Sequence, residues 1–282
     1  MYPILTSEPL AQGLTRLVVE APLVARRRQP GQFVIVRAAE DGERIPLTIV
    51  DASEAAGTVT LIVQAVGKST RVITSLRAGD ALLDVVGPLG NPTPLLRASR
   101  VACVAGGVGV AELLPIARAL RGEGNTLDSM LGARSRALVI LEGEMRALSA
   151  SFTLTTDDGS YGRAGRVADP LRERLEGGER WDAVYAVGPL PMMKAVAELT
   201  RPYGVHTLVS VNALMVDGTG MCGGCRLNVG GAMKFACVDG PEFDGHAVDF
   251  DVQIRRNRTY RAQEQAADAA HVGACALQGE RA

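Results

Sequence analysis

The sequence predicts a fold that combines an all-β antiparallel unit, a parallel α/β unit and a short cysteine-rich segment, in that order. Short β-prone runs divided by turns fill the first third of the chain, whereas strands alternate with helices in the middle. Three of the five cysteines then crowd between residues 222 and 237. With 282 residues the chain is longer than one compact core usually requires. We expect units at 1–96, 97–211 and 212–259, followed by a tail at 260–282.

The N-terminal unit is expected to be an antiparallel barrel or sandwich, because its β-prone runs are short, evenly spaced and separated by turn clusters. One of these turns is formed by residues 40–43, and a short helix fits residues 69–75. The expected strands are Leu14–Glu20, Gln32–Arg37, Pro46–Asp51, Thr58–Ala65 and Ala81–Val86.

Beyond a break at Gly87–Pro92, the pattern changes to β-turn-α units. A buried-strand run at Val101–Ala105, a glycine-rich turn and an amphipathic stretch at Ala111–Arg121 form the first unit. Such alternation predicts a parallel sheet that is covered on both faces. Further strands are expected at Thr126–Leu131, Ala137–Leu141, Phe152–Thr155, Ala183–Val187 and Thr207–Val211, with helices at Leu171–Leu175 and Met192–Arg201 and in the tail at Tyr260–Ala270.

Composition and charge exclude several classes of protein. Lys plus Arg total 30 against 31 for Asp plus Glu, so the formal charge of −1 is too balanced for a nucleic-acid-binding protein. We expect no secretory signal peptide, because no basic start precedes an apolar run. The most apolar stretch, Val101–Leu120, contains glycines and charges and is not expected to span a membrane. The expected location is therefore the cytoplasm.

The strongest chemical motif is Asp217-Gly-Thr-Gly-Met-Cys222-Gly-Gly-Cys225, which is followed by Cys237. Its glycines let backbone N–H groups approach the sulfur atoms without obstruction by side chains. Crowded cysteines in a reducing compartment indicate a metal or cluster site, and a 2Fe-2S cluster takes four ligands. Asp217 is our candidate for the fourth ligand, because a carboxylate oxygen can bind iron. The alternatives are Asp239, Asp244, His246 and Cys275.

Two other interpretations of the cysteines stay open at this point. A structural zinc site also uses a short cysteine pair, although it normally takes four Cys or His ligands in two pairs. The cysteines can also be small buried apolar residues, but a glycine-rich loop has little apolar periodicity for them to serve.

Two glycine-rich turns are candidates for binding a pyrophosphate. Gly106, Gly107 and Gly109 stand between an expected strand and an expected helix, where free N–H groups and the helix dipole favour an anion. Their spacing is not the full Gly-x-Gly-x-x-Gly fingerprint, so a tight turn without a ligand is an alternative. Gly188 and Pro189 follow another expected strand, at the same carboxyl edge of the sheet, where ligands bind in open α/β folds.

A third motif lies in the N-terminal unit. Arg44 can pair with a pyrophosphate, and Thr48 can hydrogen-bond the edge of a flavin ring. Taken alone, the two are more often a solvated arginine and an ordinary strand residue. The whole motif comprises Arg44, Pro46, Leu47, Thr48, Gly67, Ser69 and Thr70.

The order of these motifs resembles the ferredoxin-NADP reductase superfamily, in which a barrel with Arg-x-Pro-Leu-Thr precedes Gly-Gly-x-Gly and Gly-Pro-x-x-Met-Met. With the cysteine segment at the end, the chain resembles the electron-transfer subunit of dihydroorotate dehydrogenase B and its relatives from residue 1 to about residue 260. Asp217, Glu112 after Ala111, and Thr156–Gly162 resemble one branch, the small (alpha) subunits of NADH-dependent reduced ferredoxin:NADP oxidoreductase, also known as sulfide dehydrogenases.

The resemblance implies three cofactors and a partner. It places FAD at the seven-residue N-terminal motif, NAD(H) or NADP(H) at the two glycine-rich turns, and a 2Fe-2S cluster at Asp217 and the three crowded cysteines. The implied partner is a larger flavin and iron–sulfur subunit that handles reduced ferredoxin. The carboxylate at 217 departs from the all-cysteine pattern of the dihydroorotate type, so a role in pyrimidine synthesis does not follow.

The expected activity is that of an FAD-dependent NAD(P)H oxidoreductase subunit, in which electrons pass from the nucleotide through FAD to the cluster and on to the partner. The alternatives are a dihydroorotate dehydrogenase subunit, a self-sufficient ferredoxin or quinone reductase, and a non-catalytic zinc-stabilised nucleotide-binding module. For the nucleotide, Arg134 can meet a 2′-phosphate, whereas Glu142 can bond a ribose hydroxyl. The resemblance favours NAD(H).

Overall fold

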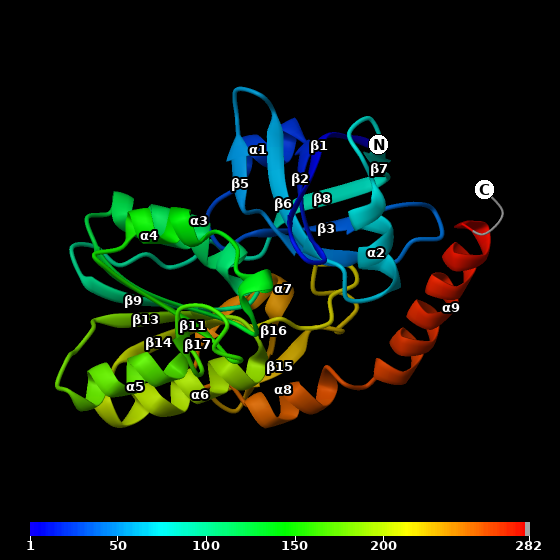
Figure 1. Cartoon of the computed structure of the whole chain (residues 1–282). Helices are drawn as coiled ribbons and strands as arrows, with labels where there is room; N and C mark the ends of the chain where they lie inside the picture. The colour runs from blue at the N-terminus through cyan, green and yellow to red at the C-terminus, as the bar shows by residue number, and fades with distance from the viewer. Residues whose placement is uncertain (280–282) are drawn as a thin grey trace.

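The N-terminal part of the chain is an antiparallel β-structure of two sheets. The computed structural model describes residues 1–279, with side chains described through residue 273. The strands of this part are β1 (Tyr2–Ala11), β2 (Leu14–Glu20), β3 (Phe33–Arg37), β4 (Ile45–Thr48), β5 (Asp51–Ser53), β6 (Thr58–Gln64), β7 (Ala81–Leu82) and β8 (Asp84–Leu89), and its helices are α1 (Pro22–Arg27) and α2 (Lys68–Ser75). One sheet has the order β5-β6-β2-β1-β7 and the other has the order β4-β3-β8. Figure 1 shows this part above the remainder of the molecule.

The second part is a seven-stranded sheet with helices on both faces. Its parallel strands are β9 (Arg100–Gly106), β10 (Thr126–Ala133), β11 (Ser151–Thr156), β12 (Arg163–Ala164), β13 (Ala183–Val187) and β14 (His206–Ser210). The helices are α3 (Gly109–Gly122), α4 (Glu142–Leu148), α5 (Ala168–Glu176) and α6 (Leu190–Thr200). In Figure 1, α3 and α4 cover one face and α5 and α6 cover the other. These observations confirm the expected fold class.

One expected strand of this sheet is wrong. Instead of a strand at Ala137–Leu141, the chain forms a 3-10 turn at Arg136–Leu138, and α4 begins directly after Leu141. The place beside β10 is taken by β11, whose register partners in β10 run from Asp128 to Ala133. Ile140 and Leu141 are buried in the core under α3. A short apolar run can therefore bury its side chains from a loop, and its composition does not distinguish the two cases.

The cysteine-rich segment completes the edge of the large sheet. It contains the hairpin strands β15 (Arg226–Val229) and β16 (Ala232–Phe235), helix α7 (Ala236–Asp239), strand β17 (Glu242–Asp244) and helix α8 (Phe250–Arg256). β17 pairs with β14 antiparallel. The boundary expected at 211–212 therefore marks a change of composition, while hydrogen bonds of the sheet continue across it.

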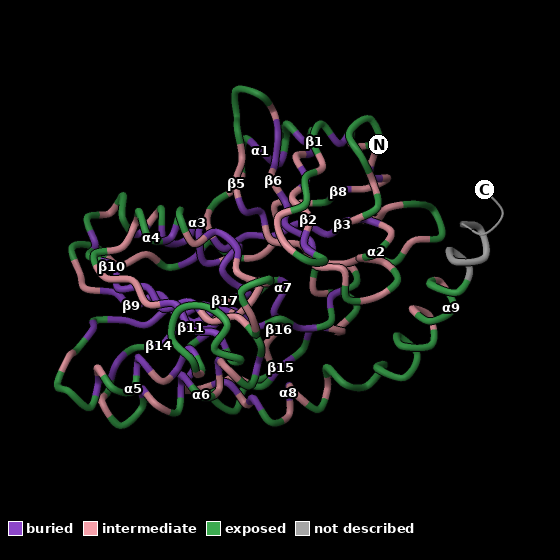
Figure 2. The backbone as a smooth tube through the Cα atoms, viewed as in Figure 1, coloured by how far each residue is buried: buried purple, intermediate pink, exposed green. Residues whose placement is uncertain are grey.

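The tail forms a helix, α9 (Arg261–Gly279), that extends from the body of the molecule. Its described side chains are mostly exposed, in contrast to the buried strands of both parts in Figure 2. The helix contacts α2 through a salt bridge of 2.7 Å between Arg71 and Asp268. The expected helix at Tyr260–Ala270 is present and continues further toward the C-terminus.

Candidate functional site

The two glycine-rich turns lie against each other at the carboxyl edge of the large sheet. β9 ends at Gly106, and the neighbouring strand β13 ends directly before Gly188. A Cβ atom on Gly109 would lie 2.5 Å from the carbonyl oxygen of Val187, and one on Gly188 would lie 3.0 Å from the backbone nitrogen of Gly106. Contacts this short require glycine. The structure thus brings together the predicted residues Gly106, Gly107, Gly109, Gly188 and Pro189.

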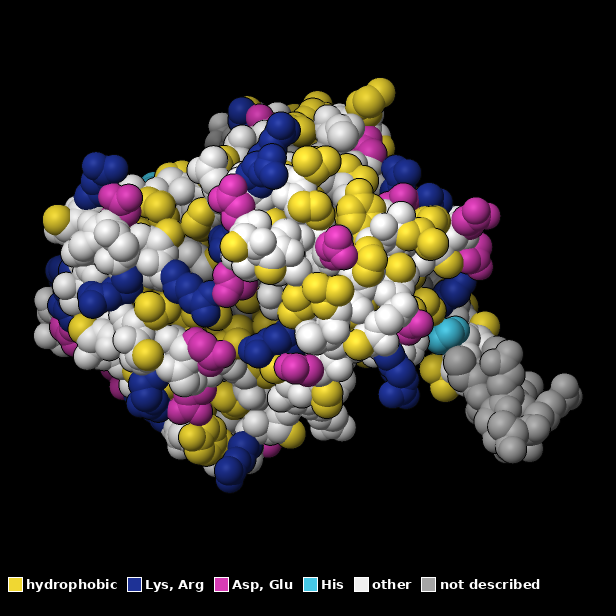
Figure 3. Space-filling model, turned by 90° about the horizontal axis from the view of Figure 1, so that it is seen from above, with side chains coloured by type: hydrophobic (Ala, Val, Ile, Leu, Met, Phe, Trp, Pro, Cys, Tyr) yellow, Lys and Arg dark blue, Asp and Glu magenta, His cyan; other side chains and the backbone are white. Residues whose placement is uncertain are grey.

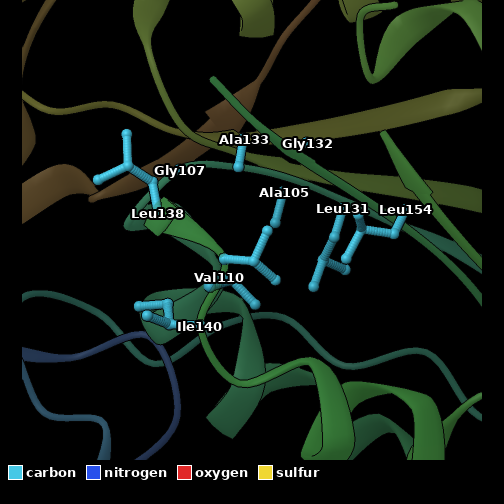
Figure 4. A pocket seen from close by; sticks show the side chains of 10 residues that line it. Ala105, Gly107, Val110, Leu131, Gly132, Ala133, Leu138, Ile140 and Leu154 are labelled. Atoms are coloured by element: carbon cyan, nitrogen blue, oxygen red, sulfur yellow. The ribbon is translucent and has the colours of Figure 1, made fainter. Parts of the chain in front are cut away.

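This meeting point is the switch point of the sheet, because the strand order reverses between β9 and β13. Gly107 has a φ of +57°, and a Cβ atom there would meet nothing within 4 Å, so the turn is open on that side. An apolar pocket adjoins the turn, and Figure 4 shows Leu131, Leu154 and Ile140 among the side chains around it. An open glycine turn at a helix start suits a pyrophosphate. The apolar pocket beside it has a volume of only about 10 Å³, so a planar base would need its side chains to move.

A polar hollow lies next to this pocket, on the loops that follow β10 and β11. It is lined by Ser135, Arg136, Ala137, Asp158 and Ser160. Arg134 and Glu142 are the two residues that the sequence suggests for distinguishing NAD from NADP, and their surroundings differ. Arg134 is exposed, whereas Glu142 forms a salt bridge of 2.7 Å with Arg146 on α4.

The N-terminal motif occupies β4 and the start of α2. The hydroxyl of Ser69 donates a hydrogen bond to the carboxylate of Glu43, so the two halves of the motif are neighbours. Arg44 is exposed and forms no salt bridge with any side chain in residues 1–273. Thr70 is used internally, because its hydroxyl accepts the N–H groups of Val66 at 2.9 Å and Gly67 at 3.1 Å. A free guanidinium beside a helix start fits the pyrophosphate of FAD, and Thr70 shapes the turn.

Pro46, Leu47 and Thr48 lie in β4 as register partners of Ile35, Val34 and Phe33 in β3. Of these three motif residues, Thr48 lies beside the second part of the molecule, where its hydroxyl favours the ionised form of Glu112 in the first turn of α3 and so acts to lower the pKa of Glu112.

The sequence alone predicts no role for Glu112. Its carboxylate also accepts a hydrogen bond from the Ser210 hydroxyl at the end of β14. Burial raises the pKa of Glu112 above its ordinary value, although the bonds from Ser210 and Thr48 act in the opposite direction. One feature of the sequence pointed to it, since an acidic residue interrupts the apolar start of a buried helix.

A second carboxylate, that of Glu242, lies beside the first. Glu242 is the register partner of Ser210 across β14 and β17, and it accepts a hydrogen bond of 2.8 Å from the Thr93 hydroxyl. Burial, followed by the charge of Glu112, raises the pKa of Glu242 to about 8. Nothing in the local sequence distinguishes Glu242 from a surface residue, because the contact depends on how β17 joins the sheet.

Two of the three predicted cysteine ligands form a buried pair. The sulfur atoms of Cys225 and Cys237 lie 3.2 Å apart, and both residues are free cysteines. Burial, followed by the neighbouring Cys225, raises the pKa of Cys237 to about 12. Cys222 is exposed on the same loop, and its sulfur accepts the N–H of Gly224 at 3.4 Å.

Asp217 organises the loop around Cys222. One carboxylate oxygen accepts the N–H of Thr219 at 2.9 Å, and the other accepts the N–H of Cys222 at 2.8 Å. The bond from Thr219 is the main reason that the pKa of Asp217 lies below its ordinary value. No three Cys, His, Asp or Glu side chains within the described residues are gathered closely enough to hold a metal ion. The donor set nevertheless fits a 2Fe-2S cluster, with two adjacent thiols and one further thiol and carboxylate on one short loop.

The alternative fourth ligands, like Asp217, take part in local hydrogen bonds. Asp239 accepts the N–H of Phe235 at 2.7 Å, and Asp244 accepts the N–H of His246 at 2.9 Å. The ring of His246 lies 3.0 Å from the Thr200 hydroxyl. The side chain of Cys275 lies outside the described residues.

The cysteine loop packs directly on the N-terminal part. A Cβ atom on Gly218 would lie 2.6 Å from the Leu89 side chain and 2.9 Å from that of Ile35. Ile35 is the register partner of Pro46 in the N-terminal motif. The motif and the cysteine loop are therefore separated by little more than one strand.

The surface agrees with the balanced charge of the sequence. Basic and acidic side chains are intermixed over the face shown in Figure 3. Among the described residues, no helix has the length and apolar character needed to cross a bilayer.

Comparison with known proteins identifies relatives over nearly the whole chain. Residues 212–249 match the family model for the iron-sulfur cluster binding domain of dihydroorotate dehydrogenase B. A homologue of the dihydroorotate dehydrogenase B (NAD(+)) electron transfer subunit from Thermotoga maritima is 45% identical over 91% of this chain and 90% of its own length. The electron transfer subunit from Geobacillus thermodenitrificans is 36% identical, covering 85% of this chain and 94% of its own.

Solved structures agree with these matches. A chain from the NADH-dependent reduced ferredoxin-NADP oxidoreductase, studied for flavin-based electron bifurcation, has a TM-score of 0.91 and 39% identity, covering 96% of this chain and 98% of its own. Phthalate dioxygenase reductase shares the fold, with a TM-score of 0.59 and 21% identity over 91% of this chain and 79% of its own.

Proposed function

The chain belongs to the family of dihydroorotate dehydrogenase B electron transfer subunits and their homologues, and on this premise we propose a path for its electrons. It is an electron-transfer subunit that uses a nicotinamide nucleotide, FAD and a 2Fe-2S cluster. The path runs from a nucleotide at the two glycine-rich turns, through FAD at β4 and α2, to a cluster at Asp217, Cys222, Cys225 and Cys237.

One observation carries this proposal, namely that the candidate flavin site adjoins both the nucleotide turns and the cysteine loop. Thr48 bonds Glu112, three residues after Gly109, so the flavin motif adjoins the nucleotide turns. Gly218 packs against Ile35, so the same motif adjoins the cysteine loop. When bound, FAD supplies the conversion between a two-electron donor and a one-electron acceptor. The protein contributes by holding the three groups close together.

Each set of residues has a separate task. The open turn at Gly107 and the helix start behind it hold the pyrophosphate of the nucleotide, and apolar side chains border this turn. The unpaired guanidinium of Arg44 holds the pyrophosphate of FAD. Thr48 bonds the edge of the flavin ring and fixes its position relative to α3. Asp217, Cys222, Cys225 and Cys237 hold the iron atoms.

We further propose that the physiological acceptor is a larger flavin and iron–sulfur subunit, through which reduced ferredoxin is handled. The likeness to the reduced ferredoxin-NADP oxidoreductase chain over almost its whole length supports this partner. A dihydroorotate dehydrogenase subunit is the second candidate, supported by the names of other relatives. We place the protein in the cytoplasm and propose NAD(H) as its nucleotide, a choice supported by the likeness to the NADH-dependent oxidoreductase chain.

The experiment is to reduce the flavin of the purified chain with NADH or NADPH under anaerobic conditions. Faster reduction by NADH is expected, with low turnover on soluble acceptors until the partner subunit is added. Steady turnover with a soluble quinone or ferredoxin alone would contradict the proposal that a partner subunit is the physiological acceptor. Restoration of dihydroorotate oxidation by a dihydroorotate dehydrogenase catalytic subunit would favour the second candidate.

A further inference from the structure

We propose that Glu112 and Glu242 form a proton-holding pair that is linked to the flavin site through the Thr48 hydroxyl. This inference rests on the proposed function, because it requires a flavin beside β4. The pair lies where the three units of the molecule meet. Thr48 belongs to the N-terminal β-structure, Glu112 to the nucleotide-binding unit and Glu242 to the cysteine-rich segment.

The geometry connects the two carboxylates through one residue. Ser210 donates its hydroxyl to Glu112, and its backbone is paired with that of Glu242. Directly opposed residues on antiparallel strands have Cα atoms only about 5 Å apart. The strand pair therefore holds both acids at one small site.

The site is closed on the side of Glu242. A Cβ atom on Gly31 would lie 2.8 Å from a carboxylate oxygen of Glu242, so the backbone of the N-terminal unit covers this acid. Thr93, which donates to the same carboxylate, is itself buried. Glu242 therefore has a hydroxyl donor and is half-buried.

Among the described side chains, no positive charge compensates the two acids. Within residues 1–273, neither Glu112 nor Glu242 forms a salt bridge with lysine, arginine or histidine. The other titratable groups that act on this interior are Tyr185 of β13 and Cys103 of β9, and burial raises the pKa of each to about 12. Both glutamates are half-buried, and two adjacent carboxylates without a cation resist being ionised together, so the pair retains a proton to higher pH than an isolated carboxylate does.

Thr48 gives this proton a route. With FAD bound, the carboxyl of Glu112 would give its proton to the hydroxyl oxygen of Thr48, and the original hydroxyl proton of Thr48 would pass to a hydrogen-bond acceptor atom at the edge of the flavin ring. Thr48 is unchanged by this step, Glu112 becomes ionised, and no electron moves. The reverse step returns the proton, so Glu112 is a positioning residue that adjusts the local charge through Thr48 while electrons arrive at or leave the flavin site.

The first test needs no cofactor. Infrared spectroscopy of the full chain, prepared without flavin, is expected to show the carbonyl band of a protonated carboxylic acid at neutral pH, which titrates with an apparent pKa of about 8. Glu242→Gln is expected to remove this titration, whereas Glu8→Gln, on an exposed strand position, leaves it unchanged. Absence of the band from the unaltered chain, or its persistence in both Glu242→Gln and Glu112→Gln, would overturn the pair.

The second test is the pH dependence of the flavin midpoint potential in the flavin-loaded chain. The plot is expected to bend at the apparent pKa of the pair, and Glu112→Gln and Thr48→Val are expected to remove the bend. Thr48→Ser, which keeps the hydroxyl, restores it. An unchanged bend in Glu112→Gln at full flavin occupancy overturns the link. Failure of the unaltered chain to bind flavin would overturn the proposed function, and with it the link between Glu112 and the flavin site. The infrared band tests the pair of Glu112 and Glu242 independently of flavin.

Discussion

The sulfur atoms of Cys225 and Cys237 lie 3.2 Å apart, although twelve positions separate the two residues in the chain. The hairpin of β15 and β16 returns the chain so that the second thiol meets the first. Both thiols are buried, whereas Cys222 is exposed on the loop that precedes them. The fold therefore fixes half of the proposed ligand set and leaves the other half on a short glycine-rich loop.

Replacement of one thiol of the buried pair is expected to remove the cluster. Cys225→Ala should lower bound iron and acid-labile sulfide to a small fraction of the amounts in the unaltered protein, because three donors do not complete the coordination of two iron atoms. Cys103→Ala is the matched control, since Cys103 is also a buried free thiol but lies within β9. Full iron content in Cys225→Ala would remove this residue from the ligand set.

The fourth ligand is tested by two aspartates. Asp217→Ala is expected to reduce cluster occupancy more strongly than Asp239→Ala, because Asp217 bonds the N–H of Cys222 whereas Asp239 bonds that of Phe235. The measurement is the visible and EPR spectrum of each variant, normalised to iron content. Unaltered spectra in Asp217→Ala would place the fourth ligand elsewhere.

The contact between the two glycine-rich turns predicts a steep effect of one methyl group. Gly109→Ala places a Cβ atom 2.5 Å from the carbonyl oxygen of Val187, so the turns must separate. NADH affinity should fall on the order of tenfold or more, with a loss of about 1–3 kcal/mol in the free energy of unfolding. Calorimetric titration with NADH and urea unfolding measure the two effects.

The control for this prediction lies at the other end of the same helix. A Cβ atom on Gly122 would meet nothing within 4 Å, so Gly122→Ala should leave NADH affinity unchanged and raise stability by less than about 1 kcal/mol. Equal NADH affinities in the two variants would show that the turns do not bind the nucleotide.

Much of this site was within reach of the sequence, because the relevant patterns are local. The strand periods identified β2 and β13 with their observed bounds, and the glycine turns were located by their place between strand and helix. The same reasoning wrongly predicts a strand at Ala137–Leu141, where an apolar run lies in a loop and buries Ile140 and Leu141. It also gave no indication of β1 and α1, whose sequences lack a clean alternation.

The carboxylate pair shows where such reasoning ends. The sequence shows Glu112 as an acidic residue in an apolar helix, but its partner Glu242 lies 130 positions further along the chain. The contact arises only because β17 joins β14 at the edge of the sheet. Long-range pairing of this kind is determined by tertiary packing, which local periodicity does not encode.

A buried aspartate at the edge of the large sheet opposite the nucleotide turns leads us to expect that the stability of the protein falls in acid. Asp128 is buried and accepts bonds from Arg100 at 2.8 Å and from the Trp181 ring nitrogen at 2.7 Å. Burial opposes its ionisation, but the bonds from Ser151 and Trp181 and the charges of Arg174 and Arg100 outweigh burial and lower its pKa.

A folded-state pKa below the unfolded value of about 4 stabilises the protein above that pH, and the stabilisation is lost as the pH falls through the folded value. At pH 7, the free energy of unfolding of Asp128→Asn should therefore be lower than that of the unaltered protein by on the order of 3 kcal/mol. When the pH falls below about 4, the free energy of unfolding should decrease less in Asp128→Asn than in the unaltered protein. Urea unfolding at both pH values checks this, and parallel pH profiles of the two proteins would contradict it.

The central claim is that one chain holds FAD and a 2Fe-2S cluster and accepts electrons from a nicotinamide nucleotide. The most direct measurement is the visible and EPR spectrum of the anaerobically purified protein before and after NADH, with flavin, iron, sulfide and zinc determined on the same sample. We expect flavin absorption that bleaches on addition of NADH, together with the EPR signal of a reduced 2Fe-2S cluster. Stoichiometric zinc without iron or flavin would rule out this electron-transfer role and favour a metal-stabilised binding module.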